Sequence, residues 1–187
     1  KIKYKFVDNE KVMEWPIKKD SKREGSVIIY EFPIQNAPLN LYFAGVDTVS
    51  AKKVQIKNSD SLMACYIVKG VHNIEGEFSQ KQIVAEFVGR HDDPYVTYDI
   101  VTILWELYNA RPLIEVNQES YMQWLIMNKK QRLCVKASEL QNLSEISPNY
   151  SSNSDYGINL PPNAANTIKS YLYDLIIEYL EQPVTKY

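Results

Sequence analysis

The hydrophobic pattern of this 187-residue chain changes its period near the middle, and this change limits the fold more than any other feature. Four stretches before residue 90 are rich in β-branched and aromatic residues and are bounded by turn-forming residues, which is typical of strands. They are Ser26 to Phe32, Leu41 to Asp47, Ser61 to Lys69 and Gln82 to Val88. A polar connection containing Glu75 to Glu77 precedes the fourth stretch. Their succession predicts an antiparallel meander.

From residue 100 the apolar residues fall at helical spacing, and residues 109–112 close the segment. The residues with this spacing are Ile100, Val101, Leu104, Leu107 and Tyr108. The run from Leu113 to Asn117 then predicts a strand, Tyr121 to Met127 predicts a second helix, and Leu133 to Val135 is a candidate for a further short strand. The sequence therefore predicts an α/β fold, in which helices flank a central mixed sheet made of an antiparallel meander and parallel strands.

The two ends of the chain differ from this middle part. Residues 1–25 are charged and weakly periodic, so we expect an arm or linker that leads into a domain at residues 26–187. Residues 138–160 are rich in Ser and Asn, and we expect a polar surface excursion there. Pro161 to Asn163 then predicts the start of a helix. Its apolar stripe comprises Ile168, Tyr171, Leu172, Leu175, Ile176 and Tyr179.

Charge and cysteine content exclude some classes of protein. The formal net charge of −2 gives no whole-molecule attraction to nucleic acid, so DNA binding would need a local patch of Lys and Arg. Cys65 and Cys134 each lie in an apolar stretch, which favours buried free thiols over a disulfide framework or a zinc site. The first residues lack the long apolar run of a signal peptide or membrane span, so we expect no membrane partner.

Two of the predicted strands end in a carboxylate. The stretch from Leu41 arrives at Asp47, and the stretch from Leu113 arrives at Glu115. Sites in open α/β sheets gather at the carboxyl ends of strands, so these acids would converge if their strands were adjacent. Carboxylate oxygens together with water suit Mg²⁺ or Mn²⁺. Acids at strand ends also commonly cap a loop or pair with a Lys, so the two acids alone leave a structural role open.

An ordered set of short segments surrounds these acids. It comprises Tyr42 to Thr48, Ser59 to Ala64, Ile83 to Arg90, Leu107 to Ala110, Ile114 to Asn117 and Tyr156 to Ile158. In order and spacing the set resembles the nuclease domain of the large terminase subunit, the DNA-packaging motor protein of tailed bacteriophages. The resemblance covers residues 26 to 180, roughly, and rests on the whole set rather than on any single motif.

This resemblance implies an RNase H-like fold whose acidic cluster binds two Mg²⁺ or Mn²⁺ ions and cuts double-stranded DNA during genome packaging. Asp47 matches the family's first-strand Asp and Glu115 its fourth-strand Glu, which implies that both are catalytic metal ligands. In a two-metal site one ion activates the attacking water and the other stabilises the leaving oxygen, so no histidine base is required. His72 and His91 lie in polar connections, where we expect surface residues.

Further residues are candidates for the same site. Asp60 opens the strand after Asp47, and we expect an auxiliary metal ligand or a residue of the metal's water shell there. Asn117 lies two residues beyond Glu115 and is a candidate for a phosphate contact or for orienting Glu115, with a role in the turn as the alternative.

Two basic clusters are candidates for contacts with DNA phosphates. One comprises Lys52, Lys53 and Lys57, and the other comprises Lys129, Lys130 and Arg132. A solvated charged surface is the alternative for both clusters.

The chain departs from the family in its third carboxylate, which terminases supply beyond the helix that matches Tyr171 to Leu180. Asp174 lies away from the apolar stripe of that helix and should face solvent, and Asp155 lies in the predicted excursion. We therefore expect that the domain is truncated at its C-terminal end and that this chain alone is short of a metal ligand.

The sequence holds no G-x-x-x-x-G-K-[ST] phosphate loop, so the resemblance implies an ATPase domain upstream in the same full-length chain. It also implies the portal and the small terminase subunit as partners. The expected location is the cytoplasm of an infected bacterium or of one that carries a prophage. Two alternatives stay open, namely another RNase H-like nuclease of the resolvase or integrase type, and a non-catalytic docking domain of the packaging motor.

Overall fold

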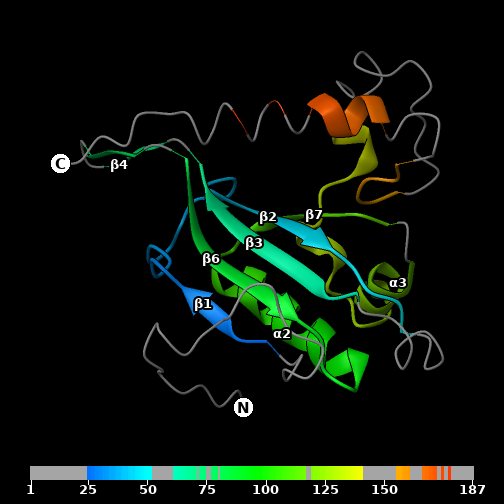
Figure 1. Ribbon diagram of the computed structural model, residues 1–187. Coiled ribbons are helices and arrows are strands. Elements are labelled where there is room, and N and C mark those ends of the chain that lie inside the picture. The colour runs from blue at the N-terminus through cyan, green and yellow to red at the C-terminus, as the bar shows by residue number, and fades with distance from the viewer. Residues whose placement is uncertain are drawn as a thin grey trace.

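A five-stranded mixed sheet forms the centre of the protein, as seen in the computed structural model in Figure 1. The structure describes residues 25–51, 61–70, 72–74, 77–79, 81–116, 119–140, 155–160 and 166–171, together with 174 and 177. The strands of this sheet are β1 (Val27–Ile29), β2 (Tyr42–Asp47), β3 (Met63–Lys69), β6 (Gln82–Gly89) and β7 (Arg111–Ile114). Their order across the sheet is β1-β6-β3-β2-β7. The α/β class predicted from the sequence is therefore confirmed.

The sheet is part antiparallel and part parallel. Strands β2, β3 and β6 form an antiparallel meander, as the sequence predicts. Helix α2 (Pro94–Leu107) then carries the chain to β7, which pairs in parallel with β2. As a result, β2 has a neighbour on each side, and the carboxyl ends of β2 and β7 lie at the same edge of the sheet.

The prediction that the first strand continues the meander is wrong. β1 pairs antiparallel with β6 and not with β2. The cause is competition for edges: β3 and β7 occupy both sides of β2, whereas the outer edge of β6 is free to accept β1. The backbone amides of Tyr30 and Glu31 extend this contact, because both donate to the Val84 carbonyl oxygen, at 2.8 and 3.1 Å.

Three further elements differ from the sequence predictions. Helix α2 begins at Pro94 rather than at Ile100, because the Asp93 side chain accepts a hydrogen bond from the Tyr95 amide and proline is favoured in the first turn. His72 lies in a strand instead of a polar connection, since β4 (His72–Ile74) and β5 (Glu77–Ser79) form a two-stranded antiparallel sheet. Further helical elements are α3 (Glu119–Met127) and the 3₁₀ turns η2 (Gln131–Leu133) and η3 (Ala137–Glu139), and η2 replaces part of the strand predicted at 133–135.

Residues 155–160 do not form the expected polar excursion. Ile158 makes a parallel bridge with Glu115, and its amide donates to the Ile114 carbonyl oxygen at 2.8 Å. The Gly157 amide donates to the Val135 carbonyl oxygen at 2.8 Å. Ile158 is only 8% exposed, so this short segment extends the sheet beyond β7. The Ser- and Asn-rich composition of residues 138–160 predicts the excursion, although Tyr156 to Ile158 belongs to the ordered set of short segments; residues 141–154 lie outside the described residues.

The main core lies between the sheet and the helices α2 and α3. Its largest fully buried side chains include Trp105 and Tyr121, and the Trp105 indole N–H donates to the Tyr121 hydroxyl at 3.1 Å. Cys65 and Cys134 are buried free thiols, as predicted, and burial raises the pKa of each to about 12. In the described part of the chain we find no helix with the length and hydrophobicity that a membrane crossing needs.

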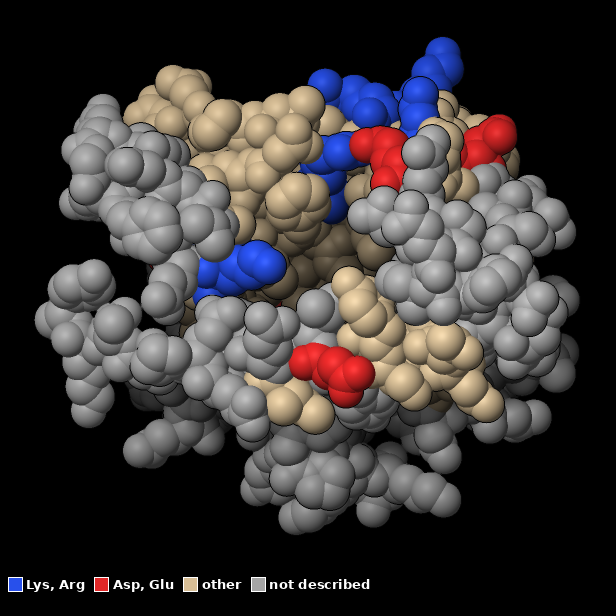
Figure 2. Space-filling model, turned by 90° about the horizontal axis from the view of Figure 1, so that it is seen from above, with Lys and Arg blue, Asp and Glu red and all other residues tan. Residues whose placement is uncertain are grey.

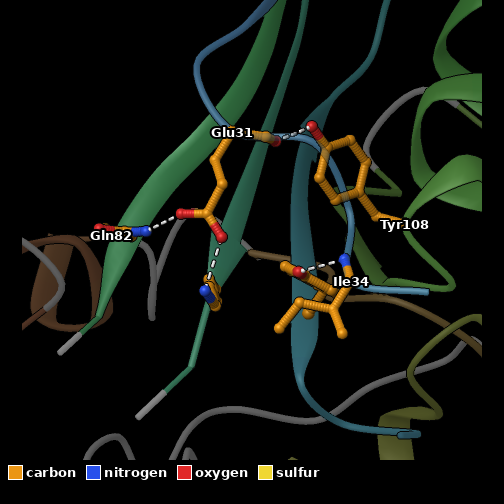
Figure 3. A network of polar contacts seen from close by, with 6 residues as sticks. Glu31, Ile34, Gln82 and Tyr108 are labelled. Carbon is orange, nitrogen blue, oxygen red and sulfur yellow. Dashed lines mark hydrogen bonds and ion pairs between the residues drawn. The ribbon is translucent and has the colours of Figure 1, made fainter. Parts of the chain in front are cut away.

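A polar network around Glu31 lies at the end of the sheet where β2 begins (Figure 3). The Lys69 ammonium donates to Glu31 Oε1 at 2.6 Å, and the Gln82 side-chain amide donates to Glu31 Oε2. The Glu31 carbonyl oxygen accepts a hydrogen bond from the Tyr108 hydroxyl, at 2.5 Å. This Glu31 network joins the connection after β1 to β3, to β6 and to the end of α2.

Candidate functional site

The register between β2 and β7 brings Asp47 and Glu115 side by side. Val46 and Ile114 are the last registered pair; Asp47 is the next and last residue of β2, and Glu115 directly follows β7. The Glu115 amide donates to the Val46 carbonyl oxygen at 3.0 Å, so the pairing continues to this point. Neighbouring strands lie about 4.8 Å apart, and residues opposite each other project to the same face. The predicted convergence of Asp47 and Glu115, called here the carboxylate pair, is a feature of the fold.

The carboxylate pair lies on the face of the sheet that α2 does not cover. Along β2 the residues Tyr42, Ala44 and Val46 are buried, while Phe43, Gly45 and Asp47 are exposed. On β7, Ile114 is buried with the first set, so Glu115 projects with the second. Both acids therefore stand on rigid strands and face away from the main core.

Hydrogen bonds fix the segments that adjoin the carboxylate pair. The Thr48 hydroxyl donates to the Glu115 carbonyl oxygen at 3.2 Å and ties the two strand ends together. The buried Tyr98 hydroxyl donates to the Val49 carbonyl oxygen at 2.7 Å. On the other side, Arg90 donates from Nη1 to the Ser61 carbonyl oxygen at 3.0 Å, just before β3. These bonds hold the residues that follow Asp47 and the start of the neighbouring strand β3, so they preorganise the position of Asp47.

Gly157 supports the carboxylate pair from the other side of β7. Its φ of +74° lies in the left-handed region, and a Cβ at this position would lie 2.4 Å from the Ile114 carbonyl oxygen. Only glycine allows the segment to approach β7 so closely. This approach lets the Val116 amide donate to the Ile158 carbonyl oxygen at 2.9 Å and so fixes the backbone on both sides of Glu115.

A helix near the C-terminus, formed by residues 166–171, 174 and 177, packs beside the carboxylate pair. Ile168 is fully buried against Ile158, and Leu113 of β7 packs against both. Because Leu113 and Glu115 project to the same face, this C-terminal helix covers β7 on the side of the acids. Figure 1 shows the helix in orange, on the opposite side of the sheet from α2.

Burial raises the pKa of the Asp47 carboxyl group above its ordinary value. Two smaller effects oppose this rise, namely a hydrogen bond from the Thr48 backbone and the positive charge of Lys169. Lys169 belongs to the C-terminal helix and is exposed, so it is the cation that this helix brings to the carboxylate pair. Asp47 is thus exposed on one side and partly desolvated by the surrounding protein on the other.

Figure 2 shows the molecule from the side of the C-terminal helix. The visible described surface is hollowed near its centre, with Lys and Arg side chains at the margin of the hollow and acidic side chains nearby. Charges of both signs therefore gather on this face, although the chain as a whole is close to neutral.

The structure does not bring every predicted site residue to the carboxylate pair. Lys130 forms an ion pair with Glu106 at 2.7 Å, near the end of α2. Since α2 leads into the start of β7, Lys129 and Lys130 lie at the other end of that strand from Glu115. The predicted residues Asp60, Asn117, Lys52 and Lys53, together with Lys57, lie outside the described residues.

A third acidic ligand is not found in the described part of the chain. Among those residues, no group of three or more His, Cys, Asp or Glu side chains could hold a metal ion. Asp174 is exposed, as predicted, and Asp155 is exposed as well. The described donor set therefore consists of the two carboxylates.

Sequence reasoning missed Lys169 and the Thr48 hydroxyl. Lys169 follows the stripe residue Ile168, but only the packing of the helix on β7 shows that it approaches Asp47. Thr48 directly follows the predicted strand end, where a hydroxyl commonly bonds to nearby backbone, so its position was a usable signal.

Comparison of the chain with protein-family models finds no match, and comparison with curated proteins finds none either.

Proposed function

We propose that this chain is the nuclease domain of a DNA-packaging terminase and acts as a metal-dependent endonuclease on double-stranded DNA. The observation that carries the proposal is the carboxylate pair, in which Asp47 and Glu115 stand on adjacent parallel strand ends and face the same side. Two acids held together by the register of a sheet have a fixed separation, which a metal site needs.

The order of the strands supports an RNase H-like fold for this domain. A three-stranded antiparallel meander is followed by a helix and then by a strand parallel to the first. Several of the segments that carry the resemblance to terminases fall on these strands, with Asp47 ending β2 and Glu115 following β7. Their spacing along the chain and their meeting in space therefore agree with one proposal.

The donor set fits a hard divalent cation. Mg²⁺ is usually held by one or two carboxylates together with water and substrate phosphate, so Asp47 and Glu115 supply enough protein ligands for one ion. A bound Mg²⁺ or Mn²⁺ would lower the pKa of water and neutralise charge on the phosphodiester. The chain's own residues orient the carboxylates, through the Thr48 hydroxyl and the backbone pairing of β7 with residues 156–158. A second ion would need further ligands.

The proposal extends to the partners and location that the terminase resemblance implies. The nuclease domain would work with an ATPase domain in the same full-length chain and with the portal and small terminase subunit. Its location would be the cytoplasm of an infected or prophage-carrying bacterium. The exposed face with the carboxylate pair would then receive DNA that the motor has threaded.

The test is nicking of supercoiled plasmid in Mn²⁺ by the intact protein. Asp47→Ala and Glu115→Ala should each lower the rate about 1000-fold, because a catalytic metal ion supplies several kcal/mol to the transition state. Asp99→Ala is the matched control, since Asp99 is exposed on α2, across the sheet from the carboxylate pair. Full activity in both site variants would end the proposal, and a preference for a four-way junction over linear duplex would favour a resolvase.

One observation favours a second candidate, a non-catalytic docking domain of the packaging motor. The described residues hold two carboxylates near each other and no cluster of three. Calorimetric titration of the intact protein with Mn²⁺ distinguishes the two functions. Heat of binding that Asp47→Ala abolishes supports the nuclease, and a silent titration of the wild-type protein supports the docking domain.

A further inference from the structure

Gly45 occupies the middle of β2 although nothing described around it requires a glycine. Its backbone is not in the left-handed region, and a Cβ built there would have no described atom within 4 Å. Gly157 differs in both respects. A glycine inside a strand loses more conformational freedom on folding than other residues and packs no side chain, so a strand is normally better without it. Glycine at this position is therefore explained better by what approaches it than by the fold.

Gly45 is exposed even though its strand lies inside the sheet. Its partners in register are Tyr66 on β3 and Leu113 on β7, and both are partly buried. Leu113 packs against the cluster of Ile158 and Ile168, which brings the C-terminal helix over it, whereas Gly45 is exposed. The backbone of β2 at Gly45 is thus exposed in a strip of surface between the helix and the side chains of β3.

This strip leads to the carboxylate pair. Asp47 lies two residues beyond Gly45 on the same face, which is about 7 Å along a strand. Lys169 on the helix side brings a positive charge to this end of the strip. On the other side Glu86, which pairs with Tyr66, accepts a hydrogen bond from the Tyr30 hydroxyl at 2.9 Å. The positive charge of Lys169 favours a polyanion on the helix side of the strip, and at its end the negative charge of the acids would need a bound cation.

We propose that Gly45 is a positioning residue that lets the sugar–phosphate backbone of one DNA strand lie directly on β2, with the next phosphodiester at Asp47 and Glu115. This inference rests on the proposed nuclease function and adds the path of its substrate. A side chain at position 45 would lift the DNA strand by the thickness of that side chain. A displacement of about 1 Å can lower an enzymatic rate about 100-fold, so even a methyl group should be detected.

The test is a series of increasing size, Gly45→Ala and Gly45→Val. We expect kcat/KM for plasmid nicking to fall about tenfold for alanine and about 100-fold for valine. Affinity for a duplex measured in EDTA should fall in the same order, while Mn²⁺ affinity should stay unchanged. Thermal stability should stay equal or rise, because valine favours strands. The matched control is Val27→Ile, which also adds one carbon to an exposed strand position but lies on β1, at the far edge of the sheet.

If Gly45→Val keeps the wild-type kcat/KM and duplex affinity, the inference is overturned. This holds even if Asp47→Ala is inactive, in which case the proposed nuclease function still stands. A lower melting temperature in Gly45→Ala would also overturn it, because the loss would then be structural. Failure of the proposed function gives a different result, in which Asp47→Ala and Glu115→Ala retain full nicking activity. Unchanged duplex affinity with an intact fold would leave this strip as a surface for a protein partner and not for DNA.

Discussion

Two carboxylates at opposite ends of the central sheet differ in their surroundings. Glu31 lies where β2 begins, and its side chain accepts hydrogen bonds from Lys69 and Gln82 (Figure 3). Asp47 lies where β2 ends, and its described partners are the Thr48 backbone and, through its charge, Lys169. The side chain of Glu31 is held by two protein donors, whereas Asp47 is exposed and the register places Glu115 beside it.

The difference separates a structural carboxylate from a candidate ligand. A charge that is paired and hydrogen-bonded costs little to keep in a folded protein, whereas partial desolvation disfavours the charged form of Asp47. Sequence position alone does not make this distinction, because Asp47 and Glu31 both adjoin strands. The partners of each carboxylate make it, and each prediction below changes those partners at one end of the sheet.

The largest effect on stability is expected at the Asp47 end, from Gly157→Ala. The new Cβ would lie 2.4 Å from the Ile114 carbonyl oxygen and 2.8 Å from the Val116 side chain, in a backbone conformation that alanine adopts poorly. We expect a loss of about 3 kcal/mol in the free energy of unfolding, measured by urea denaturation. Nicking activity should fall too, because the segment that holds β7 beside Glu115 would move.

Gly45→Ala is the matched control for this prediction. It is the same chemical change, but no described atom lies within 4 Å of the new Cβ. Its free energy of unfolding should stay equal or rise by up to about 1 kcal/mol. Equal stabilities of the two alanine variants would show that residues 156–158 do not support the Glu115 end of the sheet.

A smaller loss is expected from Glu31→Ala at the opposite end. The Lys69 side chain is only 9% exposed, so the substitution would leave a nearly buried ammonium group without its partner. Breaking a buried pair costs about 3–5 kcal/mol, but the Glu31 side chain is 38% exposed, so we expect about 2 kcal/mol in urea denaturation. Mn²⁺ binding should be unaffected, because the network lies at the far end of β2.

The double variant Glu31→Ala with Lys69→Met serves as its control. Methionine fills the space of the lysine side chain without a charge, so the double variant should be more stable than Glu31→Ala alone. If the losses of stability in Glu31→Ala and in Lys69→Met alone add up to the loss in the double variant, the ion pair contributes nothing. The contrast between the two ends of the sheet would then disappear.

The ends of β2 and β7 could be predicted from sequence because the information is local. Alternating apolar residues place Asp47 at a strand end, and the helix that follows the meander brings Glu115 to a neighbouring strand. The partners of these acids could not be predicted in the same way. Lys169 lies near Asp47 because Ile168 packs on Ile158, a contact between distant segments that no local pattern of the sequence specifies.

The position of β1 was also beyond local reasoning. Val27–Ile29 has the composition of a strand wherever it pairs, and the choice between β2 and β6 depends on which edge β7 leaves free. The Glu31 network follows from that choice, because pairing with β6 carries Glu31 to Gln82 and Lys69. Sequence patterns therefore predicted strands and their ends, while the pairing of edges decided which charges became partners.

The smallest effect is expected from Asp47→Asn, and it changes sign with the metal. The folded-state pKa of Asp47 is raised, so the folded protein holds this proton more tightly than the unfolded chain does. The stabilisation from the protonated carboxyl is present below its ordinary value of 3.8 and is lost as the pH rises through the folded-state pKa. Asparagine does not ionise, so in EDTA at neutral pH the variant should be more stable than the wild-type protein. Because Asp47 is exposed, the gain should stay below about 1 kcal/mol.

Denaturation at several pH values, with and without Mn²⁺, measures this effect. In EDTA the gain should shrink as the pH is lowered toward the ordinary pKa of the carboxyl. With Mn²⁺ at about 100 times its dissociation constant, the wild-type protein should gain about 2.7 kcal/mol and become the more stable of the two, because the variant binds the ion poorly. A wild-type protein that gains nothing from Mn²⁺ would mean that Asp47, like Glu31, is a carboxylate whose role ends with the fold.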